Sequence, residues 1–424
     1  MRDAIGTEFY LAKTNEEVKK TMKTTLSQFM LRTGIYSGSN SRAMVPSLFA
    51  GLGAKRVLLL SDRGLEQAGV VEKVASIFDL TGHGSGPQLV GMYLDIKQDA
   101  ESRCINDAVR YAREIGADSL LAVGGGSVLD TVKGVKYALH KGLADIKEAI
   151  PGGLLYESFP KANYIPIPHI AIPTTAGTGS EVSPIAVIFN EDIQMKTNII
   201  NPFISADMAI LDPDLTVGLP PLITAFTGFD ALTHAIEALA SPTATGLTDA
   251  YALHAIRLIE KNLPVAVADG GNLDARMDLL QASLMGITAF SFALNAIPVH
   301  NMAHAYGALF RIPHGLANAV FLPVVMEMVP DLYLPKVAEL AQALNVDVEG
   351  DDTPQEALTK VVEKIRLLQH KVGLPADFKQ YNITEEALQT AIPAVMKDPA
   401  ALSFPMPAEL IAAIGQKVCP VGVK

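Results

Sequence analysis

Acidic and imidazole side chains recur at helical spacing in two apolar segments of the sequence. Asp230 and His234 lie four residues apart in FDALTHAIEA, and His300 and His304 lie four apart in VHNMAHAYG. Residues i and i+4 share one face of a helix, so each pair can direct both side chains at one point. His314 follows ten residues after His304. A carboxylate with several neutral imidazoles is a ligand set for a divalent first-row metal, and the spacing alone leaves all five groups as candidate ligands.

The alternative reading is that these residues are hydrogen-bonded members of an apolar core, which is the usual state of a single buried His. Two pairs at helical spacing and a further His, all in strongly apolar surroundings, favour the metal site instead. Polar groups are costly to bury unless they are paired or bound to a metal.

Two loops rich in glycine and hydroxyl side chains each follow an apolar run. SLLAVGGGSVLDTVKG, residues 119–134, predicts a strand, a glycine turn and a helix that begins near Ser127. Glycines let the backbone approach a pyrophosphate, and the amino end of a helix favours anions. The motif is GGGS-x-x-D and not G-x-G-x-x-G, so the common dinucleotide fingerprint is not matched. Asp130 is expected to hold the turn.

The second loop, PTTAGTGSEVSP, supplies hydroxyls and free amides that suit a phosphate or a ribose. Lys196 follows soon after and, from position alone, is better read as a solvated lysine. Asp62 ends the apolar run RVLLLSD, where an acid can hold a ribose through its hydroxyls and repel a 2′-phosphate. If a dinucleotide binds here, Asp62 favours NAD over NADP.

Composition bounds the class of protein. The 424 residues are 49% hydrophobic and 19% charged, which predicts two or more domains around a large core. The net charge of −11, with no basic run, argues against nucleic acid and anionic membrane as partners. The chain has 2 Cys, far apart, and no secretory signal is visible, which favours a reducing compartment, the cytoplasm.

One segment is long enough to span a bilayer, because no Asp, Glu, Lys or Arg occurs from Leu279 to Phe310. It contains Pro298, His300 and other polar residues, however, and lacks a flank rich in Lys or Arg. A buried helix followed by the helix that bears the metal ligands is the better reading.

Three parts are expected along the chain. Residues 1–32 form a helical extension, with an amphipathic helix over 14–31; residues 33–214 form an α/β nucleotide-binding domain; residues 215–424 form an all-helical domain. Helical periodicity covers 222–240, 247–261, 274–294, 299–311, 315–329, 334–344, 354–371, 384–396 and 407–417. A ligand cleft is expected between the two domains.

Six segments together resemble the iron-containing (group III) alcohol dehydrogenases over roughly residues 33–420. They are GGGSVLD, PTTAGTGSEVSP, ADMAILDP, GFDALTHAIEA, VHNMAHAYG and IPHGLANAV. The resemblance implies a dehydroquinate-synthase-like fold, an NAD(P) cofactor and one divalent metal, usually Fe2+ and sometimes Zn2+. It implies the metal ligands Asp230, His234, His300 and His314. It places along the cofactor Asp62, Gly125, Gly126, Ser127, Thr174, Thr175, Thr178 and Lys196.

The resemblance leaves His304 near the metal rather than bound to it, and a His suits proton transfer near neutrality. Three His and one Asp would leave a divalent centre with a net charge of about +1, still a Lewis acid. Candidate pocket walls are Phe290, Phe292 and Tyr306. The chain departs from the family at Asn40, where a second Gly is common, and at Lys97-Gln98-Asp99, where a Pro-Asn-Pro-like turn is common.

The expected function is an NAD-dependent, metal-dependent alcohol dehydrogenase that interconverts a small primary alcohol or diol and its aldehyde or ketone. The expected assembly is a homo-oligomer. The alternatives are a hydroxyacid–oxoacid transhydrogenase, a lyase of the dehydroquinate-synthase kind that regenerates its NAD, and a non-catalytic binding or scaffold protein.

Overall fold

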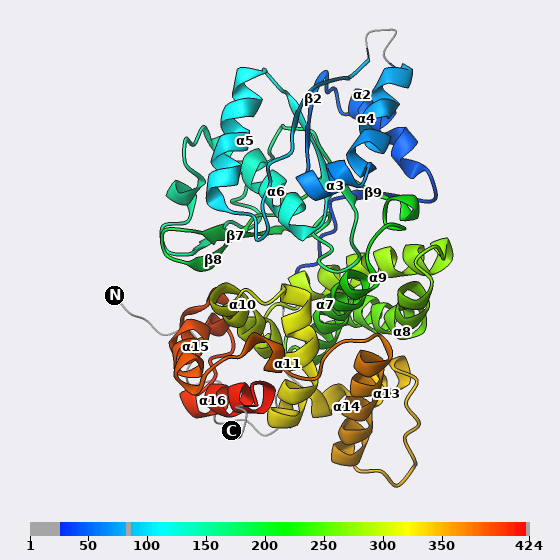
Figure 1. Ribbon diagram of the computed structural model, residues 1–424, viewed down its shortest axis with the longest axis vertical. Coiled ribbons are helices and arrows are strands. Elements are labelled where there is room, and N and C mark those ends of the chain that lie inside the picture. Colours follow the sequence, from blue (N-terminus) through cyan, green and yellow to red (C-terminus); the bar gives the residue numbers. More distant parts are fainter. Residues whose placement is uncertain (1–25, 82–85, 421–424) are drawn as a thin grey trace.

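Apolar strands bounded by glycine turns build the α/β half of the molecule, which is the upper half in Figure 1. The computed structural model describes residues 26–81 and 86–420. All pairings in the main sheet are parallel, as expected for strands that are apolar on both faces. In spatial order the sheet contains β1 (Gly34–Ser37), β9 (Met208–Leu211), β6 (His169–Pro173), β4 (Ser119–Gly124), β2 (Arg56–Leu60) and β3 (Gln88–Tyr93).

Alternating residues of these strands enter two different cores. Leu58 and Leu60 pack toward α5 (Ser102–Glu114) and α6 (Gly126–Lys141), whereas Val57 and Leu59 pack toward the opposite layer. That layer contains α2 (Val45–Gly51) and α4 (Val70–Thr81). The sheet is therefore covered on both faces, and its loops at the carboxyl ends of β4 and β6 are directed toward the helical half.

A second sheet lies at the edge of the cleft between the two halves. It contains β5 (Leu154–Tyr156), β8 (Met195–Ile200) and β7 (Ile185–Asn190) in that order. β7 and β8 form an antiparallel hairpin, and β5 pairs with β8 in parallel.

The chain after residue 220 is helical throughout the described residues, as the periodicity predicted. Three long helices pack against one another next to the α/β half: α7 (Pro221–Ala240), α8 (Gly246–Ala268) and α9 (Leu273–Phe292). The remaining longer helices are α10 (Pro298–Phe310), α11 (His314–Met328), α13 (Val337–Ala343), α14 (Pro354–Lys371), α15 (Glu385–Lys397) and α16 (Ala408–Val418). The α/β and all-α division confirms the expected fold class (Figure 1).

The helix expected over residues 14–31 is wrong for its last part. Residues 14–25 lie outside the described residues, and residues 26–31 carry no helix. Phe29 instead packs its ring against Tyr251 of α8 at 5.4 Å and against Phe292 of α9 at 5.1 Å. Contact with these two helices, rather than a local helical face, buries this apolar side chain.

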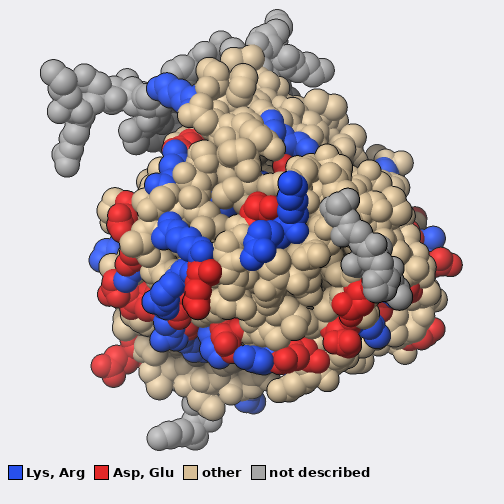
Figure 2. All heavy atoms as spheres, turned by 90° about the horizontal axis from the view of Figure 1, so that it is seen from above, with Lys and Arg blue, Asp and Glu red and all other residues tan. Residues whose placement is uncertain are grey.

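The apolar stretch from Leu279 to Phe310 forms two helices, α9 and α10, joined by a loop. Within the described residues, no single helix combines the length and the apolar character needed to cross a bilayer; α11 and the helical segment from Pro330 to Ala343 meet those limits only as a pair bent by 96°. On the face seen in Figure 2, basic and acidic side chains are interspersed among the described residues.

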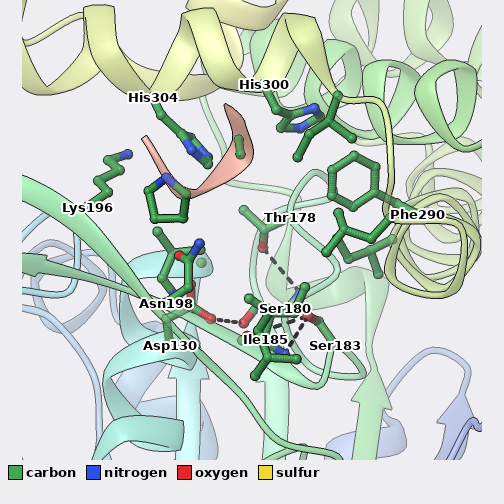
Figure 3. Close-up of a pocket in the computed structure, with 18 of the residues that line it drawn as sticks. Asp130, Thr178, Ser180, Ser183, Ile185, Lys196, Asn198, Phe290, His300 and His304 are labelled. Atoms are coloured by element: carbon green, nitrogen blue, oxygen red, sulfur yellow. Dashed lines mark hydrogen bonds between the residues drawn. The ribbon is translucent and has the colours of Figure 1, made fainter. Parts of the chain in front are cut away.

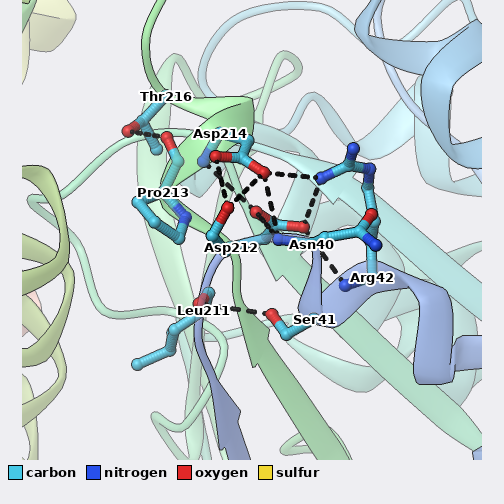
Figure 4. Close-up of polar contacts among 9 residues, drawn as sticks. Asn40, Ser41, Arg42, Leu211, Asp212, Pro213, Asp214 and Thr216 are labelled. Carbon is cyan, nitrogen blue, oxygen red and sulfur yellow. Dashed lines mark hydrogen bonds and ion pairs between the residues drawn. The ribbon is translucent and has the colours of Figure 1, made fainter. Parts of the chain in front are cut away.

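A polar network ties the first strand of the sheet to the last (Figure 4). Asp212, which follows β9, accepts hydrogen bonds from the guanidinium of Arg42 at 2.7 Å and from the backbone N–H of Asn40 at 3.2 Å. Asp214 also accepts from Asn40 N–H, at 3.0 Å. Asn40 has a φ of 60°, a left-handed conformation that Asn tolerates better than most residues, so it serves where a Gly is common in the family.

Candidate metal centre and cofactor cleft

Three helices of the second half bring the predicted metal ligands together. Asp230 and His234 lie one turn apart on α7, and both are buried. His300 lies on α10, and His314 begins α11. One ligand atom from each of Asp230, His234 and His300 lies within 4.8 Å of the others. Nε2 of His314 lies 3.5 Å from Oδ1 of Asp230, so the structure places all four predicted ligands around this carboxylate.

The donor set fits a divalent cation. Nε2 of His300 and Nδ1 of His234 are buried without a hydrogen-bond partner in the described structure. Unpaired buried polar atoms are costly, and a cation that accepts their lone pairs would remove that cost. A carboxylate with imidazole nitrogens suits iron and zinc alike.

Glu237, which the sequence reading missed, orients one of these ligands. Its carboxylate is fully buried and accepts hydrogen bonds from the backbone N–H of Val299 at 2.7 Å and from Nδ1 of His300. With Nδ1 directed at Glu237, Nε2 of His300 faces Asp230, 3.7 Å from its Oδ1. Carboxylate partners of this kind fix the tautomer and the ring orientation of a metal-binding His.

Asn318 orients Asp230 in the way that Glu237 orients His300. Its amide donates to Oδ1 of Asp230 at 2.6 Å, and it lies one turn after His314 on α11. Glu237 similarly follows His234 by one turn on α7. A polar residue one turn from a predicted ligand is the sequence signal that could have pointed to both, but the pattern does not say which ligand each one contacts.

The buried charges shift the pKa values of the cluster in opposite directions. Burial lowers the pKa of His234 to about 3 despite the charge of Asp230. Burial also opposes the charged form of His300, but the charge and hydrogen bond of Glu237 and those of Asp230 raise its pKa to about 9. Glu237 adds a second buried carboxylate beside the four predicted ligands, so the ligands, Glu237 and a divalent ion together would have a formal charge of zero.

His304 lies beside the cluster and has a carboxylate partner of its own. Its Nδ1 lies 3.3 Å from Oδ1 of Asp398, and its ring centroid lies 5.3 Å from that of His314. Asp398 is held in turn by the backbone N–H of Ala400 at 2.8 Å. Asp398 is 94 residues from His304 in the sequence, and no local pattern connects the two.

The two glycine-rich loops of the α/β half pack directly against each other. A Cβ added at Gly126 would lie 2.5 Å from Cγ2 of Thr178, and one at Gly125 would lie 3.2 Å from Oγ1 of Thr175. Glycine is therefore required for this close approach. The amino end of α6, at Gly126 and Ser127, opens into the cleft, where its N–H groups suit an anion.

Asp130 holds this pair of loops together, as its position suggested. Its carboxylate accepts a hydrogen bond from the hydroxyl of Ser180 (Figure 3). It also accepts from Nζ of Lys133 at 3.1 Å and from the backbone N–H of Val187 at 3.2 Å. The carboxylate of Asp130, which is partly buried, thus connects α6, the second loop and β7.

Of the other predicted cofactor residues, Lys196 lines the cavity, whereas Asp62, Thr174 and Thr175 do not. Nζ of Lys196 pairs with Oδ1 of Asp99 at 3.1 Å on the cavity wall, so Lys196 is a buried, paired residue and not the solvated lysine that its position alone suggested. Thr174 is buried, with its N–H bonded to the carbonyl of Gly124 at 3.0 Å. Asp62 caps the short helix α3 (Arg63–Gln67) by accepting from Leu65 N–H at 2.9 Å.

One cavity of about 350 Å³ joins the two sets of residues. In Figure 3, His300, His304 and Phe290 of the helical half face Thr178, Ser180 and Asn198 of the α/β half across it. The predicted residues that line it are Gly126, Ser127, Thr178, Lys196, Asp230, His234, Phe290, His300, His304 and His314.

Tyr306, expected on a pocket wall, is a core residue instead. It is 1% exposed, and its ring packs against Phe310, Phe321 and Phe378 at centroid distances of 5.3, 4.8 and 6.0 Å. Tyr306 lies two residues after His304, on the other side of α10, which the apolar pattern around it did not reveal.

Comparisons with known proteins agree in both halves of the chain. The family model described as iron-containing alcohol dehydrogenase matches residues 33–213, and the model described as Fe-containing alcohol dehydrogenase family, C-terminal, matches residues 224–412. Long-chain-alcohol dehydrogenase 1 of Geobacillus thermodenitrificans is 36% identical over 80% of this chain and 82% of its own length. 1,3-Propanediol dehydrogenase of Klebsiella pneumoniae is 34% identical over 87% and 92%. A crystal structure of 1,3-propanediol oxidoreductase superimposes with a TM-score of 0.85 at 32% identity, covering 93% of this chain and all of that one.

Proposed function

Because the chain belongs to the iron-containing alcohol dehydrogenase family and is an alcohol oxidoreductase, we propose that it transfers hydride between NAD and a small primary alcohol or diol at a divalent metal. The observation that carries the proposal is a shared cavity. The unpartnered imidazole nitrogens around Asp230 and the amino end of α6 open into the same space. This shared cavity supports a metal site and an anion site that would act on one substrate.

Asp230, His234, His300 and His314 would hold the metal, with iron as the first candidate and zinc as the second. When bound, such an ion supplies Lewis-acid polarisation of the alcohol or carbonyl oxygen. Glu237 and Asn318 hold two of the ligands in place before any substrate arrives. Phe290 and Ile297 on the cavity wall exclude water from the reacting carbon.

The α/β half would position the nicotinamide cofactor. Gly125, Gly126 and Ser127 at the start of α6 receive the pyrophosphate, and Thr174, Thr175 and Thr178 line the path beside it. Lys196, fixed by Asp99, lines the same cavity as the metal cluster and is assigned to the ribose or a phosphate. Asp62 at the carboxyl end of β2 favours the ribose hydroxyls of NAD over the 2′-phosphate of NADP.

His304 is assigned the proton of the alcohol. It lines the cavity, and Asp398 on its Nδ1 holds the ring in place. Because Asp398 holds one ring nitrogen of His304, the other ring nitrogen can exchange a proton with a group in the cavity.

The test is NADH formation from a panel of alcohols and diols, with metal-stripped protein re-supplied anaerobically with Fe2+ or Zn2+. Turnover that depends on the metal is expected. The variant His300→Ala should lose both the metal and the turnover and should still bind NAD. Full turnover by metal-free His300→Ala would overturn the proposal, and tight NAD and metal binding without reduction of free NAD would point to the transhydrogenase chemistry instead.

We also propose that the protein works in the cytoplasm as a homo-oligomer. Cys104 and Cys419 are both buried and unpaired, which is typical of a reducing compartment. Light scattering on the purified protein tests the assembly, and a monomeric mass at micromolar concentration would contradict it.

A further inference from the structure

The floor of the reaction cavity continues beyond it along the small sheet. The strand register aligns Tyr156 of β5, Ile200 of β8 and Ile185 of β7 in one row across this sheet. All three line the cavity that contains the metal cluster, and all three also line a second cavity of about 490 Å³. Leu294, in the loop after α9, lines both cavities as well. The two cavities therefore meet over these three aligned side chains, and Leu294 lies where they join.

The second cavity suits an uncharged, mainly apolar group. Phe159, Pro184, Pro202 and Phe292 form its apolar walls, and Leu26, 98% exposed, lies at its rim. Among the described residues that line it, Glu157 is the sole charged side chain, and Asn201 already donates to its carboxylate at 2.6 Å. The remaining polar atoms of the lining are mostly hydroxyls, on Ser27, Ser158, Thr243, Thr245 and Ser291.

We propose that the second cavity receives the aliphatic tail of the substrate, so that the protein acts on unbranched primary alcohols and aldehydes longer than the short ones that the reaction cavity alone would hold. The inference rests on the proposed function, because it needs the reacting carbon beside His300. From there an alkyl chain would pass over Ile185 and Ile200 and beneath Leu294 into the second cavity. An anionic tail is disfavoured, since no basic side chain is among the described residues that line this cavity and the nearby Lys141 is already paired with Glu157.

The measurement is kcat/KM for primary alcohols from ethanol to dodecanol with saturating NAD. Burial of apolar surface predicts a rise of about fourfold for each methylene that enters the cavity, followed by a plateau once the cavity is filled. The rise should begin only when the chain is long enough to pass Leu294. A profile that is flat or falls beyond propanol would overturn the inference.

A matched pair of variants locates the effect. Ala244→Trp places an indole in the second cavity, because Ala244 lines that cavity and not the first. It should abolish the rise for long alcohols and leave kcat/KM for ethanol and the bound metal unchanged. Ala144→Trp, at an exposed alanine in the loop after α6, should keep the wild-type profile. An equal loss for short and long alcohols in Ala244→Trp would count against the tail site.

Thermal stabilisation gives a second measurement that needs no turnover. Octanol should raise the Tm of metal-free wild type and of Ala144→Trp more than ethanol does, and Ala244→Trp should lose the difference. An equal effect of octanol on all three proteins would refute the site. If no alcohol of any length is oxidised, the proposed function has failed; if short alcohols are oxidised but chain length has no effect, only the tail site has failed.

Discussion

Replacing Glu237 by Gln isolates the part that a buried carboxylate plays in holding the metal. Gln keeps the size of the side chain, and its carbonyl oxygen can still accept one of the two hydrogen bonds that Glu237 receives from Val299 N–H and His300 Nδ1. Its amide nitrogen cannot accept the other. The variant therefore loses a charge-assisted hydrogen bond to His300 and one negative charge beside the metal.

The expected loss follows from that change. Removing such a partner of a metal-binding His typically weakens metal affinity by about 10- to 100-fold, which corresponds to about 1.4–2.7 kcal/mol. The upper end is favoured here, because Glu237 is 0% exposed and water cannot replace it. Binding of NAD should be unchanged, because the residues assigned to it belong to the other half of the molecule.

Competition with a chelator of known affinity measures the effect, with the metal content of dialysed protein as a second readout. Glu363→Gln, at an exposed position on α14, is the control and should bind metal as wild type does. Metal affinity within twofold of wild type in Glu237→Gln would refute the orienting role. A loss of helical circular dichroism in that variant would assign the effect to folding instead.

His304→Ala should slow turnover at least tenfold while the affinity for metal changes little, because His304 lies beside the cluster with Asp398 as its partner; loss of the metal itself would make His304 a ligand. Asp62→Gly should raise the NADP/NAD ratio of kcat/KM by at least tenfold through removal of the repelling carboxylate, and an unchanged ratio would remove Asp62 from the ribose. Burial raises the pKa of Glu181 from 4.5 to about 7, against its own backbone N–H and the charge of Lys133, so the folded state keeps a proton that the unfolded state releases. The contribution of this proton to the free energy of unfolding is complete below about pH 4.5. It falls by about 1.4 kcal/mol per pH unit as the pH rises from about 4.5 to about 7, and it is lost above that. Urea unfolding measures the free energy of unfolding of wild type and Glu181→Gln at pH 5 and at pH 8. From pH 5 to pH 8 the wild type should lose more of this free energy than the variant does; an equal change in both proteins would show that Glu181 does not titrate in this range.

Local spacing predicted those features of the site that each lie on one element. Asp230 and His234 share a helix face, and Gly125 and Gly126 follow a buried strand, so a short stretch of sequence carries the whole pattern. The order of strands and helices also predicted the two-part architecture. The spacing could not choose four ligands from five groups, since His304 occupies the same face of α10 as His300.

The rest depends on packing between distant segments. Glu237 reaches His300 because α10 lies on α7, and Asp398 reaches His304 because the end of α15 lies on α10. Neither contact leaves a periodic signal. The same cause explains the wrong helix over residues 26–31, where Phe29 gains more by packing on α8 and α9 than from a helical face.

The position of β1 sets an order of events during synthesis. Among the described residues, β1 occupies one edge of the main sheet and pairs with β9 alone, the last of these strands to be made. β2, β3, β4 and β6 can align while the chain is still growing, since domains fold from the amino end as they emerge. β1 must wait until residues 208–211 have left the ribosome. The first described strand is therefore among the last to join the sheet. Until β9 is made, the backbone N–H and C=O groups of β1 and of the edge of β6 that will pair with β9 are unpaired and need shielding from other chains.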